Sequence, residues 1–125
     1  DMYLMSQIIF YAQSIVHLPE VLYHYRKDNE NAMTAADRKR RHLASSANLL
    51  ALYGKYRDNI AQSPIRRAAD GIVLRAGWHS LIHGRDFFKE YEWLKDAIGR
   101  ARVSRNYRTP VLFQLIVKGY AKMKG

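Results

Sequence analysis

The sequence predicts a mainly α-helical fold of about five helices, with one short β element near residues 15–26. Apolar residues recur at intervals of three and four along most of the chain, which is the spacing that lines one face of a helix. A hydroxyl residue followed by proline, a typical helix start, occurs at Ser63-Pro64 and again at Thr109-Pro110. Strands and helices do not alternate after the β element, so helical packing rather than a parallel sheet is expected there.

Two elements are expected in the first quarter of the chain. A helix over residues 2–14 is indicated by one apolar face, which comprises Leu4, Ile8, Tyr11 and Ile15. Pro19 cannot continue a helix, because it lacks a backbone N–H and its ring clashes with the preceding turn. The β-branched and aromatic run over residues 21–25 follows and indicates a strand.

A long helix is expected next. Thr34, with Asp37 three residues later, has the spacing of a capping box and predicts a helix that reaches about Tyr56. Residues 38–41 are all basic and form its first turn, which the helix dipole disfavours. An acid or a bound anion near this turn should therefore compensate the charge.

The third helix should lie at the centre of a bundle. It is expected to run from Pro64 to about His83, and Gly84 should end it. Its stretch over residues 72–82 is apolar on almost every side apart from Arg75. A helix that is apolar all round is buried on all sides, which predicts a central position.

Two further helices complete the expected fold. Asp86 can cap a helix that Gly99 closes, with an apolar face of Phe87, Tyr91, Leu94 and Ile98. Residues 100–108 are basic and lack periodicity, so we interpret them as a loop. The second hydroxyl and proline pair then opens a terminal helix that reaches about Lys122. Its apolar face is predicted to comprise Leu112, Leu115, Ile116 and Gly119.

The chain is strongly basic. Its 125 residues include 21 Lys and Arg against 11 Asp and Glu, which gives a formal net charge of +10. Such a charge favours an anionic partner, which could be nucleic acid, an anionic membrane surface, or a phosphate-bearing substrate such as a sugar nucleotide or lipid diphosphate. A solubilising surface whose acidic complement lies on another part of the protein is an equally good explanation of the charge.

Two absences bear on the compartment. The chain has no cysteine, which excludes disulfides and thiolate metal sites and fits a reducing environment. No apolar run approaches the roughly 20 residues that a membrane-spanning helix requires. We therefore expect a cytoplasmic protein, with association at the inner face of the membrane as a further expectation.

The opening segment carries the most specific pattern. Asp1 directly precedes an apolar helix with Leu4 in its first turn, a hydrophobic strand follows, and Tyr23, Tyr25 and Arg26 lead into a polar loop. This order resembles the end of the catalytic domain in family 2 glycosyltransferases. The pattern of that family runs Glu-Asp-x-x-Leu, an aliphatic and aromatic helix, a strand, then Tyr-x-Tyr-Arg and a polar loop.

The resemblance implies a division of the chain into two parts. Residues 1–34 would form the C-terminal end of a catalytic domain with the α/β nucleotide-diphosphosugar fold known as GT-A, and residues 35–125 a helical C-terminal extension. The parallel sheet and the Asp-x-Asp metal motif of such enzymes do not occur in this sequence. The fragment is therefore expected to complete a GT-A domain and to be inactive alone.

The same resemblance implies site residues. Asp1 would be the catalytic base that takes the proton from the acceptor hydroxyl, although an Asp ahead of a helix also serves as a cap. Arg26, His24 and Asn31 are expected at the donor diphosphate, where a planar guanidinium matches phosphate oxygens. His24 is also expected as a metal ligand, with a solvated strand residue as the alternative. The divalent metal, Mg²⁺ or Mn²⁺, would be held mostly by residues outside this chain.

The implied reaction is inverting transfer of a sugar from a nucleotide-diphosphate donor to a hydroxyl or lipid-linked acceptor, in the synthesis of a cell-surface polysaccharide or glycoconjugate. The alternative function is a basic helical binding or oligomerisation module for nucleic acid, a membrane surface or a protein partner. Nucleic acid is disfavoured, because neither a helix-turn-helix nor an aromatic platform pattern is present. A second copy of the chain is a further expected partner.

Two other patterns each have two interpretations. The terminal helix combines a large apolar surface with Lys118, Lys122 and Lys124, which suits peripheral contact with an anionic membrane. Packing of that helix against the bundle is the favoured alternative. His79 and His83 have the i, i+4 spacing of a metal-binding pair, but without a third ligand in the pattern a structural pair is favoured.

Overall fold

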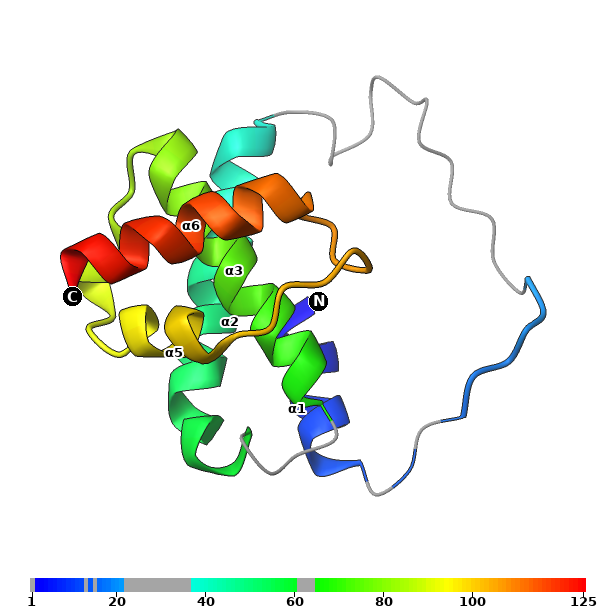
Figure 1. Ribbon diagram of the computed structural model, residues 1–125. Coiled ribbons are helices and arrows are strands. Elements are labelled where there is room, and N and C mark those ends of the chain that lie inside the picture. The colour runs from blue at the N-terminus through cyan, green and yellow to red at the C-terminus, as the bar shows by residue number, and fades with distance from the viewer. Residues whose placement is uncertain (1, 13, 15, 22–36, 61–64) are drawn as a thin grey trace.

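A computed structural model describes residues 2–12, 14, 16–21, 37–60 and 65–125 (Figure 1). This part of the chain is mainly helical, as predicted, and contains six helices. They are α1 (Met2–Tyr11), α2 (Arg38–Ile60), α3 (Arg66–His83), α4 (Phe87–Glu90), α5 (Leu94–Arg100) and α6 (Val111–Lys124).

The central helix is α3, as its apolar composition predicted. It packs against α2, α4, α5 and α6, and α6 crosses it in Figure 1. A Cβ atom added at Gly77 would lie 2.6 Å from a methyl group of Val117 on α6 and 2.8 Å from one of Ile98 on α5. The three helices therefore approach one another where α3 has no side chain. The largest fully buried side chains around α3 are Leu50, Val73, Leu74, Phe87, Leu94, Ile98, Gln114 and Val117.

The helices α2 and α3 form an antiparallel pair. His42 near the start of α2 contacts His83 at the end of α3, while the opposite ends of both helices flank residues 61–64. The start of α2 differs from the prediction. Asp37 has a positive φ of 51° and lies outside the helix, and its Oδ1 accepts a hydrogen bond from the backbone N–H of Arg40 at 3.0 Å.

The prediction of a helix that includes Asp37 is thus wrong, because Asp37 itself caps α2; Thr34 lies outside the described residues. The carboxylate sits at the positive end of the helix dipole beside the basic first turn. It is the compensating acid that the sequence led us to expect.

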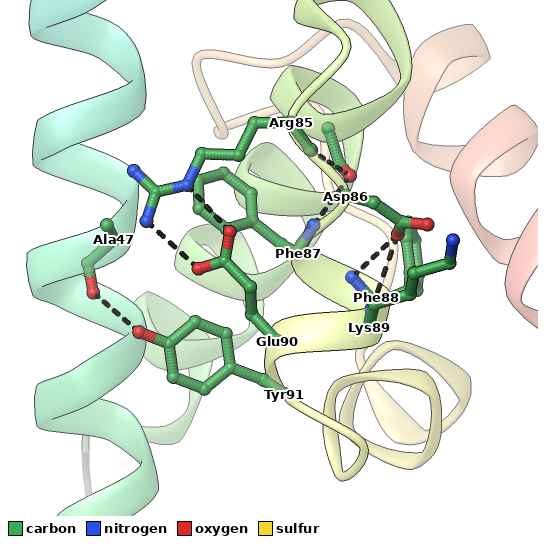
Figure 2. A network of polar contacts seen from close by, with 9 residues as sticks. Ala47, Arg85, Asp86, Phe87, Phe88, Lys89, Glu90 and Tyr91 are labelled. Carbon is green, nitrogen blue, oxygen red and sulfur yellow. Dashed lines mark hydrogen bonds and ion pairs between the residues drawn. The ribbon is translucent and has the colours of Figure 1, made fainter.

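A compact turn joins α3 to α4 (Figure 2). Gly84 ends α3 in the left-handed conformation, with φ of 76°, as predicted. Ser80 Oγ donates to the backbone carbonyl of Arg85 at 2.6 Å and accepts from the N–H of Phe87 at 3.0 Å. Asp86 caps α4, as predicted, by accepting from the N–H groups of Phe88 and Lys89. The turn therefore leaves few of its polar groups unpaired.

The single helix predicted over residues 86–99 is wrong, because α4 and α5 are separate helices. Tyr91 is extended, with φ of −130°, and breaks the helix. The break brings Trp93 into a stack on Tyr53 of α2, with ring centroids 5.1 Å apart. Tyr91 itself donates its hydroxyl to the carbonyl of Ala47 on α2 at 3.5 Å (Figure 2). Packing against α2 has overridden a local periodicity that favoured one helix.

Residues 101–110 form a loop, close to the predicted range of 100–108. The prediction that Thr109 caps the terminal helix is wrong, because Pro110 is the N-cap residue of α6 and no side chain of the described residues caps the helix.

Buried polar groups hold the loop. Asp70 Oδ2 on α3 accepts from the backbone N–H of Arg102 at 3.0 Å. Gln114, which is fully buried, accepts from the N–H of Ser104 at 3.0 Å and donates to the carbonyls of Ser104 and Thr109 at 2.7 and 2.6 Å. The loop is thereby attached to both α3 and α6.

The terminal helix α6 packs against α3 and α5, which was the favoured alternative, but the predicted apolar face is not the side that it buries. Leu112, Leu115 and Ile116 are 64%, 53% and 45% exposed, whereas the buried residues of α6 are Gln114, Val117 and Ala121. The helix turns its amide-bearing side inward, because Gln114 binds the preceding loop. The aliphatic stripe is consequently left at the surface.

The first part of the chain packs less completely than helices α2 to α6 do. Helix α1 ends at Tyr11, earlier than the predicted residue 14, and contacts α2. The hydroxyl groups of Tyr11 and Tyr56 are hydrogen-bonded at 2.5 Å. None of the described residues 16–21 is in a strand, and residues 22–26 of the predicted β element lie outside the described part. Among the described helices, none is long and apolar enough to cross a membrane.

Candidate functional site: a histidine cluster beside a cationic cavity

The site residues implied by the family resemblance are not placed. Asp1, His24, Arg26 and Asn31 all lie outside the described residues. Their assignment to a catalytic base, a donor diphosphate site and a metal ligand stays a prediction. The chemistry that the described residues bring together lies elsewhere, between α2 and α3.

Three histidines converge at one end of the antiparallel pair. His42 comes from the second turn of α2, and His79 and His83 come from the last two turns of α3. One ring nitrogen from each of them lies within 4.8 Å of the other two. The rings of His42 and His79 are parallel, with centroids 5.0 Å apart, and the ring of His83 is tilted by 45° to both.

His79 is the most enclosed member of the histidine cluster. It is 6% exposed, and its Nδ1 is hydrogen-bonded to Ser46 Oγ at 2.7 Å. Burial lowers the pKa of His79 to about 4, and the positive charge of Arg75 acts in the same direction. The imidazole is therefore neutral at pH 7 and keeps one ring nitrogen with an available lone pair.

The other two members are half-buried. Burial also lowers the pKa of His42, again with help from Arg75. In His83, the Nε2 atom is buried and has no hydrogen-bond partner within the described residues. A buried polar atom without a partner costs free energy. Packing alone therefore does not explain why Nε2 of His83 is buried without a hydrogen-bond partner among these residues.

The sequence pattern shows no third ligand beside His79 and His83, and the fold brings His42 near them. The favoured interpretation of a structural pair stays a prediction. A signal for the approach of His42 was present in the sequence. His42 and His83 are equally far from the connection at residues 61–64, and so are Ser46 and His79. In an antiparallel pair joined by a short connection, such positions face each other. Recognition of residues 38–60 and 66–83 as an antiparallel pair of helices would have brought these residues together.

A cavity of about 200 Å³ adjoins the histidine cluster. It lies between α2, α3 and the loop of residues 101–110, and His79 lines it as well as belonging to the cluster. Its polar lining residues are Ser45, Ser46, Arg75, His79, Asn106, Arg108 and Thr109. The volume is several times the roughly 30 Å³ that a water molecule occupies in the liquid, so a small polar group fits.

The cavity is cationic. Arg75 and Arg108 both line it, and no acidic residue does. Neither guanidinium has an ion pair or hydrogen bond to another described residue. Burial lowers the pKa of Arg75, and the charge of Arg108 lowers it further. Two guanidinium groups without an acidic partner in the described part of the chain, beside hydroxyl and amide groups, favour an anion, and they match a phosphate in particular.

No acid takes part in either feature, so neither resembles a pair of carboxylates for acid–base catalysis. The histidine cluster offers imidazole nitrogen ligands, and the cavity offers positive charge with hydrogen-bond donors. Both features can bind a ligand. No protein-family model, curated protein or solved structure matches the chain.

Proposed function

We propose that this chain is the C-terminal part of an inverting family 2 glycosyltransferase that moves a sugar from a nucleotide-diphosphate donor to a hydroxyl or lipid-linked acceptor at the inner face of the membrane. The observation that carries the proposal is the ordered pattern from Asp1 through Leu4 to Tyr23, Tyr25 and Arg26. In this proposal residues 1–34 end the catalytic domain, and the helical bundle is its extension.

The surface of the opening segment supports this division. Leu4, Met5 and Ile8 on α1 are 60%, 55% and 53% exposed. Tyr11, Val16, Leu18 and Val21 are exposed as well. A group of exposed apolar side chains of this kind is typical of a surface that another domain or protein covers. The catalytic domain is the partner that the family resemblance implies.

The cationic cavity supports a phosphate-bearing substrate. The net charge of +10 led us to expect an anionic partner, and Arg75 and Arg108 concentrate positive charge without acidic partners. In an enzyme that handles nucleotide diphosphates or lipid diphosphates, the cavity would bind a phosphate group of one substrate. The Mg²⁺ or Mn²⁺ of the parent reaction would be held mostly by residues outside this chain, with His24 as an expected ligand. The three-ligand cluster among the described residues consists of imidazole nitrogens, which suit other metals.

The test requires the protein with its catalytic domain. Asp1→Asn should abolish release of nucleoside diphosphate from a panel of nucleotide sugars in the presence of acceptor, while binding of the donor is retained. Arg108→Gln should raise the KM for the phosphate-bearing substrate with a smaller effect on kcat. Asp58→Asn is the matched control, because the Asp58 side chain is 96% exposed and its ion pair within the described part of the chain is a 4.0 Å contact with Arg57.

Two results would overturn the proposal. Turnover by Asp1→Asn at the rate of the control would remove Asp1 from the role of base. Absence of donor binding by the unaltered protein across the whole panel would favour the alternative, a basic helical module that binds a membrane surface, a protein or a second copy of the chain.

A further inference from the structure

The histidine cluster of His42, His79 and His83 has a geometry that its role in packing does not require. We propose that it binds a divalent transition metal ion, with Zn²⁺ as the best fit, through one ring nitrogen of each histidine. This site is separate from the oxygen-ligated Mg²⁺ or Mn²⁺ expected in the parent enzyme, and it does not depend on the glycosyltransferase assignment.

The arrangement of the backbone permits simultaneous ligation. His79 and His83 lie one turn apart on the same face of α3, and His42 faces them from α2. The three nitrogen atoms lie within 4.8 Å of one another. Ligands of a tetrahedral ion with metal–nitrogen distances of about 2.0–2.1 Å are roughly 3.3 Å apart. Small rotations of the side chains can close this difference, since His42 and His83 are only half-buried.

The surroundings of the cluster provide two features of a metal site. Ser46 Oγ lies 2.7 Å from Nδ1 of His79, and a hydrogen bond to the second ring nitrogen is what orients a metal-bound histidine. In the tautomer in which Nδ1 donates to Ser46, Nε2 of His79 carries the lone pair that would bind the metal. His83 Nε2 is buried without a partner in the described part of the chain, and a metal ion would satisfy it.

The type of ligand determines the type of ion. Imidazole nitrogen suits Zn²⁺, Ni²⁺, Co²⁺ and Cu²⁺, whereas Mg²⁺ and Ca²⁺ require oxygen ligands. Three protein ligands leave a fourth tetrahedral position for water or an anion. The cluster contains no carboxylate, and Arg75 is close enough to lower the pKa of His42 and His79. An anionic fourth ligand would offset this positive charge.

The experiment is titration of the tag-free chain with Zn²⁺, in competition with a chromophoric chelator, followed by visible absorption with Co²⁺. One equivalent of Zn²⁺ should bind, Co²⁺ should give the intense absorption bands of a tetrahedral site, and Mg²⁺ should not compete. His42→Gln and His83→Gln should each weaken Zn²⁺ binding at least about tenfold. Both residues are half-buried, so these variants should fold, and circular dichroism would verify it.

His17→Gln is the matched control, because His17 is exposed and lies outside the cluster. It should bind Zn²⁺ like the unaltered chain. The proposal is overturned if the unaltered chain binds no Zn²⁺. It is equally overturned if His42→Gln and His83→Gln bind as tightly as the control, since the ion would then be held elsewhere.

Discussion

Polar side chains hold the loop and the helix ends of this small bundle through hydrogen bonds to backbone groups. Asp70 and Gln114 are both buried, and each binds backbone groups of the loop between α5 and α6. Lys118 places its Nζ within 2.9 Å of the carbonyls of Ile98 and Gly99 at the end of α5, where the helix does not supply a full set of backbone donors. Single polar residues thus satisfy groups that a helix terminus or loop would otherwise bury unpaired.

The neutral state of His79 predicts a pH-dependent stability in the metal-free chain. The pKa is about 4 in the folded state and 6.5 ordinarily, so between these values the unfolded chain binds a proton that the folded chain does not. The free energy of unfolding should therefore fall as the pH drops from 6.5 toward 4, by up to about 3 kcal/mol. The lowered pKa of His42 acts with the same sign.

Urea denaturation in the presence of a chelator, at a series of pH values from 7.5 to about 4, measures this dependence. A histidine NMR titration should show the His79 ring unprotonated throughout most of that interval. Protonation of His79 near the ordinary value, or a stability that is flat across the interval, would contradict the prediction.

The structural roles of some single residues could be predicted from the sequence, and the roles of others could not. Gly84 and Asp86 were predictable, because the left-handed end of a helix and the cap of the next depend on local chemistry. The role of Gln114 was not, because it depends on a loop ten residues away. His42 could be joined to His79 only by pairing α2 with α3, which no local pattern shows. The residues of the opening segment stay predictions.

At the level of helices, packing partners decided what local patterns left open. Helix α3 was predictable as the central helix, because apolar residues surround it. The break between α4 and α5 was not, because it depends on the stack of Trp93 on Tyr53. The inward face of α6 was mistaken for the same reason, since a glutamine bound to a loop is more buried than neighbouring leucines.

The exposed stripe of Leu112, Leu115 and Ile116 on α6 is the surface through which the chain would contact a membrane. Of the lysines near this helix, Lys118 binds backbone carbonyls of α5 and Lys124 lies 3.6 Å from Asp86. The charge available for anionic lipid is therefore mainly that of the chain as a whole, +10. We expect the chain to float with vesicles that contain anionic phospholipid and to be released by salt.

Replacement of all three stripe residues by Ser should abolish flotation. Substitution is a better test than removal of residues 109–125, because Val117 and Ala121 belong to the core. Ile82→Ser is the matched control, since Ile82 is 48% exposed on α3. Equal flotation of the triple variant and the control would exclude the stripe as a membrane contact.

The whole molecule has two unequal parts. Helices α2 to α6 enclose one core around α3, whereas α1 attaches through its contact with α2 and leaves a row of apolar side chains exposed. The boundary near residue 34, which the family resemblance implied, stays a prediction, because residues 22–36 lie outside the described part of the chain. A mainly helical architecture was predictable from periodicity. The α/β domain that α1 would complete could be inferred only from the resemblance, since its sheet is not in this sequence.

This arrangement predicts that α1 is stabilised by a surface outside the bundle. In the protein with its catalytic domain, Leu4→Ser and Ile8→Ser should each lower the free energy of unfolding by about 1.5–3 kcal/mol, the value for a buried aliphatic side chain. In residues 1–125 alone, the same changes should have an effect within about 0.5 kcal/mol, because both side chains are already more than half exposed. Leu112→Ser, at 64% exposure on α6, is the control in both forms. Equal effects of Leu4→Ser and Ile8→Ser in the two forms would mean that no catalytic domain covers α1, because only a covered side chain loses buried area when it is shortened.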